Sequence, residues 1–163
     1  MLSLVLLGWL IGQTPSSVTV FVSAPSRDGF VDTDRGLQDS INDVANRLRK
    51  AKDVTVVDRR EIADVILTVT ARGVGSESYG QRLSYRDAYG GADLDSTPIV
   101  ANTFWVSSVL QVGKYRKEFR GARTQSSAQS LGAWGLCADE LVKNLRAWIS
   151  ANHATIVQRR GGA

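Results

Sequence analysis

The sequence predicts an α+β protein in which two helices pack on a mixed sheet of about five strands. Three observations support this prediction: β-branched runs that alternate with polar residues, two segments with apolar residues three and four positions apart, and one clear hairpin turn. With 163 residues, 43% of them hydrophobic, the chain has the size and composition of one domain with its own core. The predicted order is β-α-β-β-β-β-α in two layers.

The first predicted strand shows alternating apolar and polar residues, and the helix after it shows apolar residues three and four positions apart. In "SSVTVFVSAP", Val18, Val20 and Val22 fall on one side of an extended segment. Turn residues follow, and a helix is predicted from about 34 to 52. Apolar side chains form one stripe on it, which we expect to cover the sheet: Leu37, Ile41, Val44, Ala45 and Leu48.

The stretch "VTVVDRREIADVILTVTARG" is predicted to hold two strands, 54–57 and 65–72, joined by a charged connector. Strict alternation over 65–72 would place Ala71 on the apolar side, with Val69, and Arg72 on the polar side, with Thr68 and Thr70. Because the apolar positions on both sides of the connector belong to a core, we interpret its charges as a solvated turn.

The following segment, 73–98, is rich in Gly, Ser, Asp and Tyr, and we predict a long loop there. After it, Gly113 and Lys114 suit the two central positions of a hairpin turn. This register pairs Val112 with Tyr115 and leaves one side of the hairpin mainly apolar and the other mainly polar.

The last predicted element is a helix from about 130 to 152. Its stripe contains two tryptophans, which offer a large surface for burial. The stripe residues are Trp134, Ala138, Leu141, Leu145, Trp148 and Ile149. We predict that residues 16–152 form the single domain and that 153–163 are a flexible tail.

Residues 1–15 are predicted to be a signal peptide. The run "MLSLVLLGWLIG" is apolar and uncharged, and the polar "QTPSS" follows it. About 12 apolar residues are too few to span a bilayer core that needs roughly 20, but they match the hydrophobic region of a signal peptide. A buried strand or helix is the alternative. We therefore expect an exported protein, periplasmic or extracellular, with no stable membrane span once the signal is removed.

Roughly residues 18–73 resemble small α/β domains of bacterial envelope proteins, namely the N-terminal domain of the Tol-system propeller protein and the curli-secretion lipoprotein group. In these domains a strand ending like "VVD" precedes a strand led by "AD". The chain departs from them because it has no lipid-anchor cysteine after the leader and no propeller repeats. The resemblance implies a non-catalytic binding or assembly role, with another envelope protein as partner, and it carries over no functional residue.

The residue types that several catalytic and metal sites require are scarce. His153 is the single histidine and Cys137 the single cysteine, so a disulfide within the chain and a zinc site of nitrogen and sulfur ligands are both excluded. Cys137 is predicted to be a small core residue. We predict no catalytic residue, no metal and no cofactor. A hydrolase that uses Asp58, Glu61 or Asp64 is the alternative.

The candidate residues for partner binding come from the 73–98 segment and from the predicted hairpin. Tyrosine and arginine are enriched at protein interfaces, and the hairpin presents basic residues with a tryptophan near its end. The candidates are Tyr79, Arg82, Tyr85, Arg86, Tyr89, Trp105, Arg116 and Arg120. The basic face also suits an anionic polymer, or simply a protected edge strand, and the tyrosine segment equally suits disorder. We expect no nucleic acid partner, because export argues against one.

Overall fold

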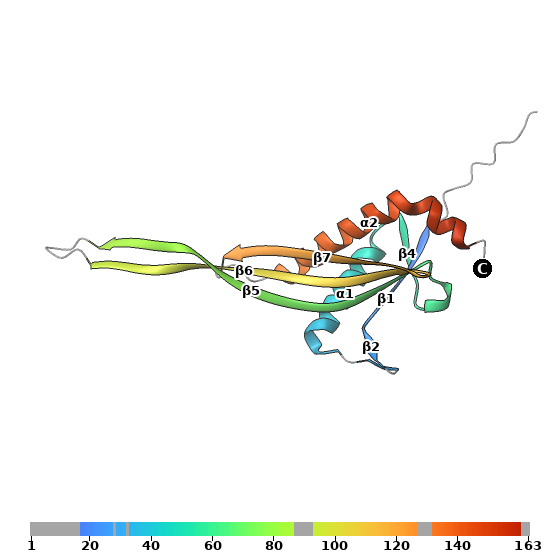
Figure 1. Ribbon diagram of the computed structural model, residues 1–163, viewed down its shortest axis with the longest axis horizontal. Helices are drawn as coiled ribbons and strands as arrows, with labels where there is room; N and C mark the ends of the chain where they lie inside the picture. Colours follow the sequence, from blue (N-terminus) through green and yellow to red (C-terminus); the bar gives the residue numbers. More distant parts are fainter. Residues whose placement is uncertain (1–16, 28, 32, 87–92, 127–131, 161–163) are drawn as a thin grey trace, which may run out of the picture.

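The computed structural model describes residues 17–27, 29–31, 33–86, 93–126 and 132–160, and for 27, 79–86, 93–99 and 126 it describes the backbone alone. Figure 1 shows a body of strands and helices from which one hairpin projects. The elements are β1 (Val18–Ser23), β2 (Ser26–Arg27), β3 (Phe30–Val31), α1 (Arg35–Arg49), β4 (Val54–Val56), the 3-10 helix η1 (Arg60–Ile62), β5 (Val65–Arg86), β6 (Asp93–Val112), β7 (Tyr115–Ser126) and α2 (Ala133–Arg160).

The main sheet has five strands in the order β4-β1-β5-β6-β7. Strand β1 runs parallel to β4 and to β5, while β5, β6 and β7 form an antiparallel meander. The predicted mixed sheet with two helices is therefore confirmed. The region after β1, which was predicted to be a turn, also contains two short strands, β2 and β3, which pair as a separate small hairpin.

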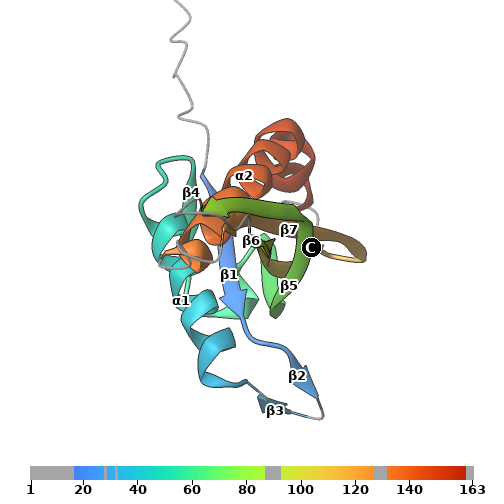
Figure 2. The same ribbon diagram turned by 90° about the vertical axis from the view of Figure 1, so that its left-hand side faces the viewer.

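Both helices lie on the same side of the sheet, and the core lies between the two layers (Figure 2). On β1 the residues Val18 and Val20 are completely buried, and their neighbour Thr19 is half-buried. The predicted stripe of α1 is confirmed, and Asp34 caps this helix by accepting a hydrogen bond from the Leu37 N–H at 2.6 Å. Among the described residues, no α-helix covers the other face of the sheet.

The β6–β7 hairpin has the register that the sequence predicted. Val112 pairs with Tyr115 across the turn, and Ser107 pairs with Arg120 farther along. Gly113 occupies the turn with φ of 56°, a backbone conformation that glycine adopts without strain. The predicted apolar side faces the helices, including the exposed Tyr115, whose ring stacks on that of Trp148 with the ring centres 5.6 Å apart.

Helix α2 packs directly on the backbone of β7. A Cβ atom added to Gly121 would overlap the carbonyl oxygen of Cys137, so the missing side chain is what lets the helix approach. Cys137 is completely buried, and its Sγ lies 3.2 Å from the carbonyl oxygen of Phe104, to which it donates a hydrogen bond. Its predicted role as a core residue is confirmed, and burial raises the pKa of its thiol.

The alternation predicted for 65–72 is wrong at its end, because a β-bulge interrupts it. Val69 pairs with Ser108 and Ala71 with Ser107, so Thr70 is an extra residue on β5. The bulge exchanges the two sides of the strand. Arg72 consequently lies on the helix side, where its guanidinium is 4.4 Å from the ring centre of Trp134.

Two boundary predictions are also wrong. The segment 73–98, predicted as a loop, is mostly strand, because β5 and β6 continue as a paired ladder as far as Arg86 and Asp93. The predicted flexible tail is mostly helix, because α2 continues to Arg160 with Ile156 buried against the core. Residues 1–15, the predicted signal peptide, lie outside the described residues.

Candidate binding surfaces

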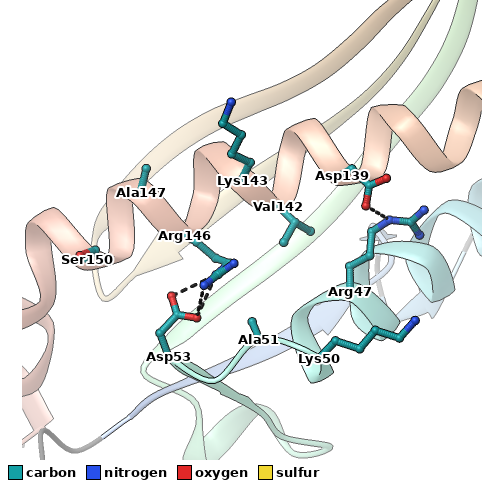
Figure 3. Close-up of a pocket in the computed structure, with 10 residues that line it drawn as sticks. All are labelled: Arg47, Lys50, Ala51, Asp53, Asp139, Val142, Lys143, Arg146, Ala147 and Ser150. Carbon is teal, nitrogen blue, oxygen red and sulfur yellow. Dashed lines mark hydrogen bonds and ion pairs between the residues drawn. The ribbon is translucent and has the colours of Figure 1, made fainter.

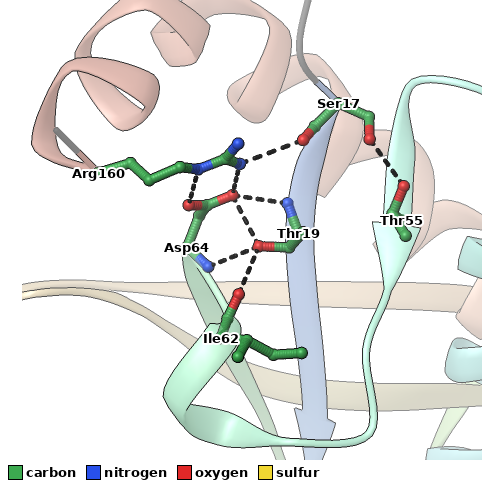
Figure 4. Close-up of polar contacts among 6 residues, drawn as sticks. All are labelled: Ser17, Thr19, Thr55, Ile62, Asp64 and Arg160. Atoms are coloured by element: carbon green, nitrogen blue, oxygen red, sulfur yellow. Dashed lines mark hydrogen bonds and ion pairs between the residues drawn. The ribbon is translucent and has the colours of Figure 1, made fainter.

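The charged connector holds a structural cluster centred on Asp64 (Figure 4). Its carboxylate accepts hydrogen bonds from the backbone N–H and the hydroxyl of Thr19, both at 2.7 Å, and from the Arg160 Nε at 2.7 Å. Arg160 also donates to the carbonyl oxygen of Ser17. The end of α2 is thereby tied to the start of β5 and of β1.

The electrostatics of Asp64 are those of a paired carboxylate. Burial opposes its ionisation, but the hydrogen bonds from Arg160 and Thr19 and the charge of Arg160 together lower its pKa below the usual value. The side chains of Asp58 and Glu61 are exposed. A hydrolase built on these three carboxylates therefore gains no support, since both oxygens of Asp64 are committed to neighbouring donors.

The basic strand face holds three of the predicted binding residues, and the structure brings two of them together. Arg120 lies over the ring of Trp105, 4.7 Å from its centre, and the indole packs against Gly73 on β5. Arg116 is exposed and lies apart from this pair. Because Arg120 already occupies one face of the indole, stacking of a base or sugar on Trp105 would first require its displacement.

The other predicted binding residues lie on the projecting hairpin. Tyr79, Arg82, Tyr85 and Arg86 belong to β5, where the described backbone is paired with β6, and Tyr89 lies outside the described residues. The described part of strand β7 ends opposite Ala101, and beyond that point the ladder has two strands among the described residues. We call this two-stranded part, residues 78–86 and 93–100, the arm (Figure 1).

A groove between the two helices is bridged by ion pairs (Figure 3). Its volume is about 590 Å³. The Arg47 Nε lies 2.5 Å from an oxygen of Asp139, and an Arg146 Nη lies 2.7 Å from an oxygen of Asp53. Each pair joins α2 to α1 or to the chain after it, and exposed pairs of this kind add at most about 1 kcal/mol, so we interpret these residues as structural links of modest strength.

A second groove lies on the uncovered face of the sheet. Its volume is about 690 Å³, and the small β2–β3 hairpin and η1 contribute to its walls. Arg60 of η1 and Arg116 of β7 both line it. The sequence indicated the polar side of these strands, but it gave no sign that Arg60 and Arg116 share one groove, because that depends on the strand order.

Among the described residues, no three histidine, cysteine or acidic side chains gather where they could hold a metal ion. No helix in the described part of the chain is long and apolar enough to cross a membrane. Two helices on one face of a mixed five-stranded sheet define a two-layer α+β domain with one open face.

Comparison with known proteins finds solved structures that are similar to this chain, including the following two. Protein XCC0632 from Xanthomonas campestris, described with the family DUF330, is 14% identical over 91% of each chain with a TM-score of 0.40. The hypothetical protein CT253 from Chlamydia trachomatis is 10% identical over 83% of this chain and 96% of its own, also with a TM-score of 0.40. No family model and no curated protein matches the chain.

Neither solved structure carries an argument about this chain, because both TM-scores are below 0.5. Both proteins come from bacteria, and neither description names a Tol-system or curli-secretion protein. The resemblance to those envelope domains therefore stays a prediction. What the chain does has to be argued from its own surfaces.

Proposed function

We propose that this protein is an exported, non-catalytic module that binds a protein partner in the bacterial cell envelope, and that the arm carries the contact. One observation supports this above the others. The β5–β6 ladder continues past the end of β7, where two strands pair without a third strand or a helix of the described chain beside them (Figure 1).

An uncovered two-stranded ladder has little stability of its own unless another element or a partner packs on it. Isolated hairpins are marginally stable in water, and three strands or a covering layer are normally needed. The arm pairs from Ser78 with Val100 to Arg86 with Asp93, which is about 30 Å at roughly 3.4 Å per residue. A partner that adds a strand to one edge or a layer to one side would supply the missing contacts.

Export rests on the sequence of the first residues, and the envelope setting rests on the resemblance and on export. The uncharged run "MLSLVLLGWLIG" matches the hydrophobic region of a signal peptide. Intact-mass measurement of the protein purified from cell fractions tests this directly. We expect the mature protein outside the cytoplasm, shorter than the translated chain by about 15 residues. Full-length protein in the cytoplasmic fraction would contradict export.

Site-specific photo-crosslinking tests the arm as a contact. A photoreactive amino acid replaces Arg82 or Tyr85 in the arm, and the matched control carries it at Lys143, an exposed position on α2. After irradiation of intact cells we expect a discrete adduct from the arm positions and none from the control. Absence of an adduct at both arm positions would contradict the proposal.

A shortened protein provides the complementary test. Ser76 pairs with Asn102, so residues 77–101 can be replaced by Asn-Gly, which favours a two-residue hairpin turn. We expect the shortened protein to keep its helical circular dichroism and its cooperative unfolding, because the core lies in the body. It should lose the partner captured through the arm, whereas retention of that partner would refute the arm as the contact.

A further inference from the structure

The groove on the uncovered face lies in the body, apart from the arm. Its floor comes from β1, β5 and β6, and one wall comes from the β2–β3 hairpin through Val31. A smaller hollow of about 260 Å³ adjoins it and shares Thr70 and Val109 with it. The two hollows together therefore run across the strands, from the β2–β3 hairpin toward β7.

The charge of this groove is positive. Arg60 and Arg116 are its charged lining residues among those described, and the adjoining hollow adds Arg120 and Glu118, so three arginines face one glutamate. Neither the Arg60 nor the Arg116 guanidinium has an ion pair or hydrogen bond with a described residue. Other arginines differ, since Arg47, Arg146 and Arg160 each pair with an aspartate. Two unpaired guanidinium groups facing one groove are suited to binding carboxylates.

The rest of the groove combines apolar contact with hydrogen-bonding capacity. Phe21 and Val109 contribute apolar surface, while Thr68 and Gln111 offer a hydroxyl and an amide. At the adjoining hairpin Phe30 is 79% exposed and Val31 is 64% exposed. Large apolar side chains exposed beside a groove are typical of a surface that a partner covers.

We infer that this groove binds an extended acidic peptide segment of another protein. Its carboxylates pair with Arg60 and Arg116, its apolar side chains contact Phe21, Val31 and Val109, and its backbone bonds to the polar floor. Hydroxyl and amide groups along the floor suit a peptide backbone, whereas an acyl chain would leave them unpaired. The charge of the groove and this mixed floor therefore favour a peptide over a lipid.

The test starts from a random peptide library displayed on phage and selected on the immobilised protein. We expect the enriched peptides to carry aspartate or glutamate between apolar residues. The affinity of a labelled enriched peptide is then measured by fluorescence anisotropy for the wild-type protein and for the double variant R60Q/R116Q. We expect binding to weaken at least about tenfold, the effect of losing roughly 1.4 kcal/mol of charge-assisted hydrogen bonding.

The matched control is R35Q/R49Q, which removes the same charge from two exposed arginines of α1, on the other side of the sheet from the groove. Its affinity should change less than about twofold, because screened surface charges contribute little at a distance. Circular dichroism of both variants confirms that they fold. Equal weakening in the two double variants would overturn the proposal, as would enrichment of peptides without acidic residues or no enrichment at all.

Two further measurements distinguish peptide binding in this groove from lipid binding and from binding through the arm. Binding of vesicles containing phosphatidylglycerol that depends on Arg60 and Arg116, without peptide binding, would overturn the peptide proposal in favour of a lipid. The protein with residues 77–101 replaced by Asn-Gly should still bind the selected peptide, because the groove contains no arm residue. Peptide binding that disappears with the arm would place the site elsewhere.

Discussion

The two faces of the sheet differ although the same strands supply both. On β5 the residues Val65 and Leu67 point toward the helices and have no exposed surface, while Ile66 and Thr68 on the other face are half-buried. Adjacent residues of one strand therefore alternate between the core and the uncovered face. The covered face holds the fold together, and the uncovered face remains available for binding.

The largest expected difference between the faces comes from truncating neighbouring side chains of β5. Leu67→Ala removes a completely buried side chain and should cost about 3 kcal/mol of unfolding free energy. Thr68→Ala removes a hydroxyl that lies 3.1 Å from that of Ser23 and should cost less than about 1 kcal/mol. Urea unfolding followed by tryptophan fluorescence measures both. Equal losses would mean that the two faces contribute equally to stability.

A smaller difference is expected between two glycines. In Gly121→Ala the new methyl group meets backbone of α2, which cannot rotate away, so we expect a loss of about 2 kcal/mol. In Gly75→Ala the methyl group enters open space, and stability should be unchanged or slightly higher. Thermal unfolding of the two variants tests this contrast. A Gly121→Ala protein as stable as the wild type would show that α2 does not rest on β7.

The smallest expected effect concerns the cluster that ties the helix layer to the strands. Asp64→Asn should cost about 1 kcal/mol at pH 7, because it removes the charge that pairs with Arg160. Asp58→Asn is the control, since its exposed side chain makes no hydrogen bond or ion pair with a described residue.

The Asp64 effect should also depend on pH. The folded protein holds the pKa of Asp64 below that of an unfolded aspartate, which is about 3.9. The stabilisation is therefore present above about pH 4 and is lost as the pH falls from there through the folded pKa. Urea unfolding of the wild type and of Asp64→Asn should converge over that range. A gap that stays constant down to low pH would contradict the ion pair.

The layer architecture and one register could be predicted because strong periodic signals specify them. Alternation on both sides of Gly113 leaves one register for the β6–β7 hairpin, since a slip of one residue would expose the apolar side. The apolar stripe of α1 was predictable for the same reason, because its residues recur at helical spacing without interruption. Both features depend on residues close together in the sequence.

The bulge and the arm could not be predicted in the same way. A single extra residue at Thr70 has no signature in the sequence, yet it reverses the sides of the residues that follow, including Arg72, as far as a second register shift between Ser78 and Gln81. The segment 73–98 is rich in Gly, Ser, Asp and Tyr, a composition that is typical of loops and so hides the paired strands. The end of helix α2 could not be predicted because the stretch after Asn152 holds only one short apolar pair, Ile156 and Val157, which shows no helical period.

The candidate sites were predicted only in part. Composition singled out the segment that forms the arm, and the register placed Trp105 near the end of the basic side of the hairpin, where it contacts Arg120. The groove did not, because Arg60 and Arg116 come from different elements and meet through the order of β1, β5, β6 and β7. The ion pair of Asp64 could not be predicted, because its partner Arg160 lies in the segment that was expected to be a flexible tail.

The arm also affects how this protein can change over evolutionary time. Insertions in a packed layer disturb many neighbours, but a ladder without a covering layer can gain or lose residues in pairs on both strands and keep its alternation. Each such step changes the reach of the arm by about 7 Å, at roughly 3.4 Å per residue. Natural variants of this chain should therefore differ more in the length of this hairpin than in the strands and helices of the body.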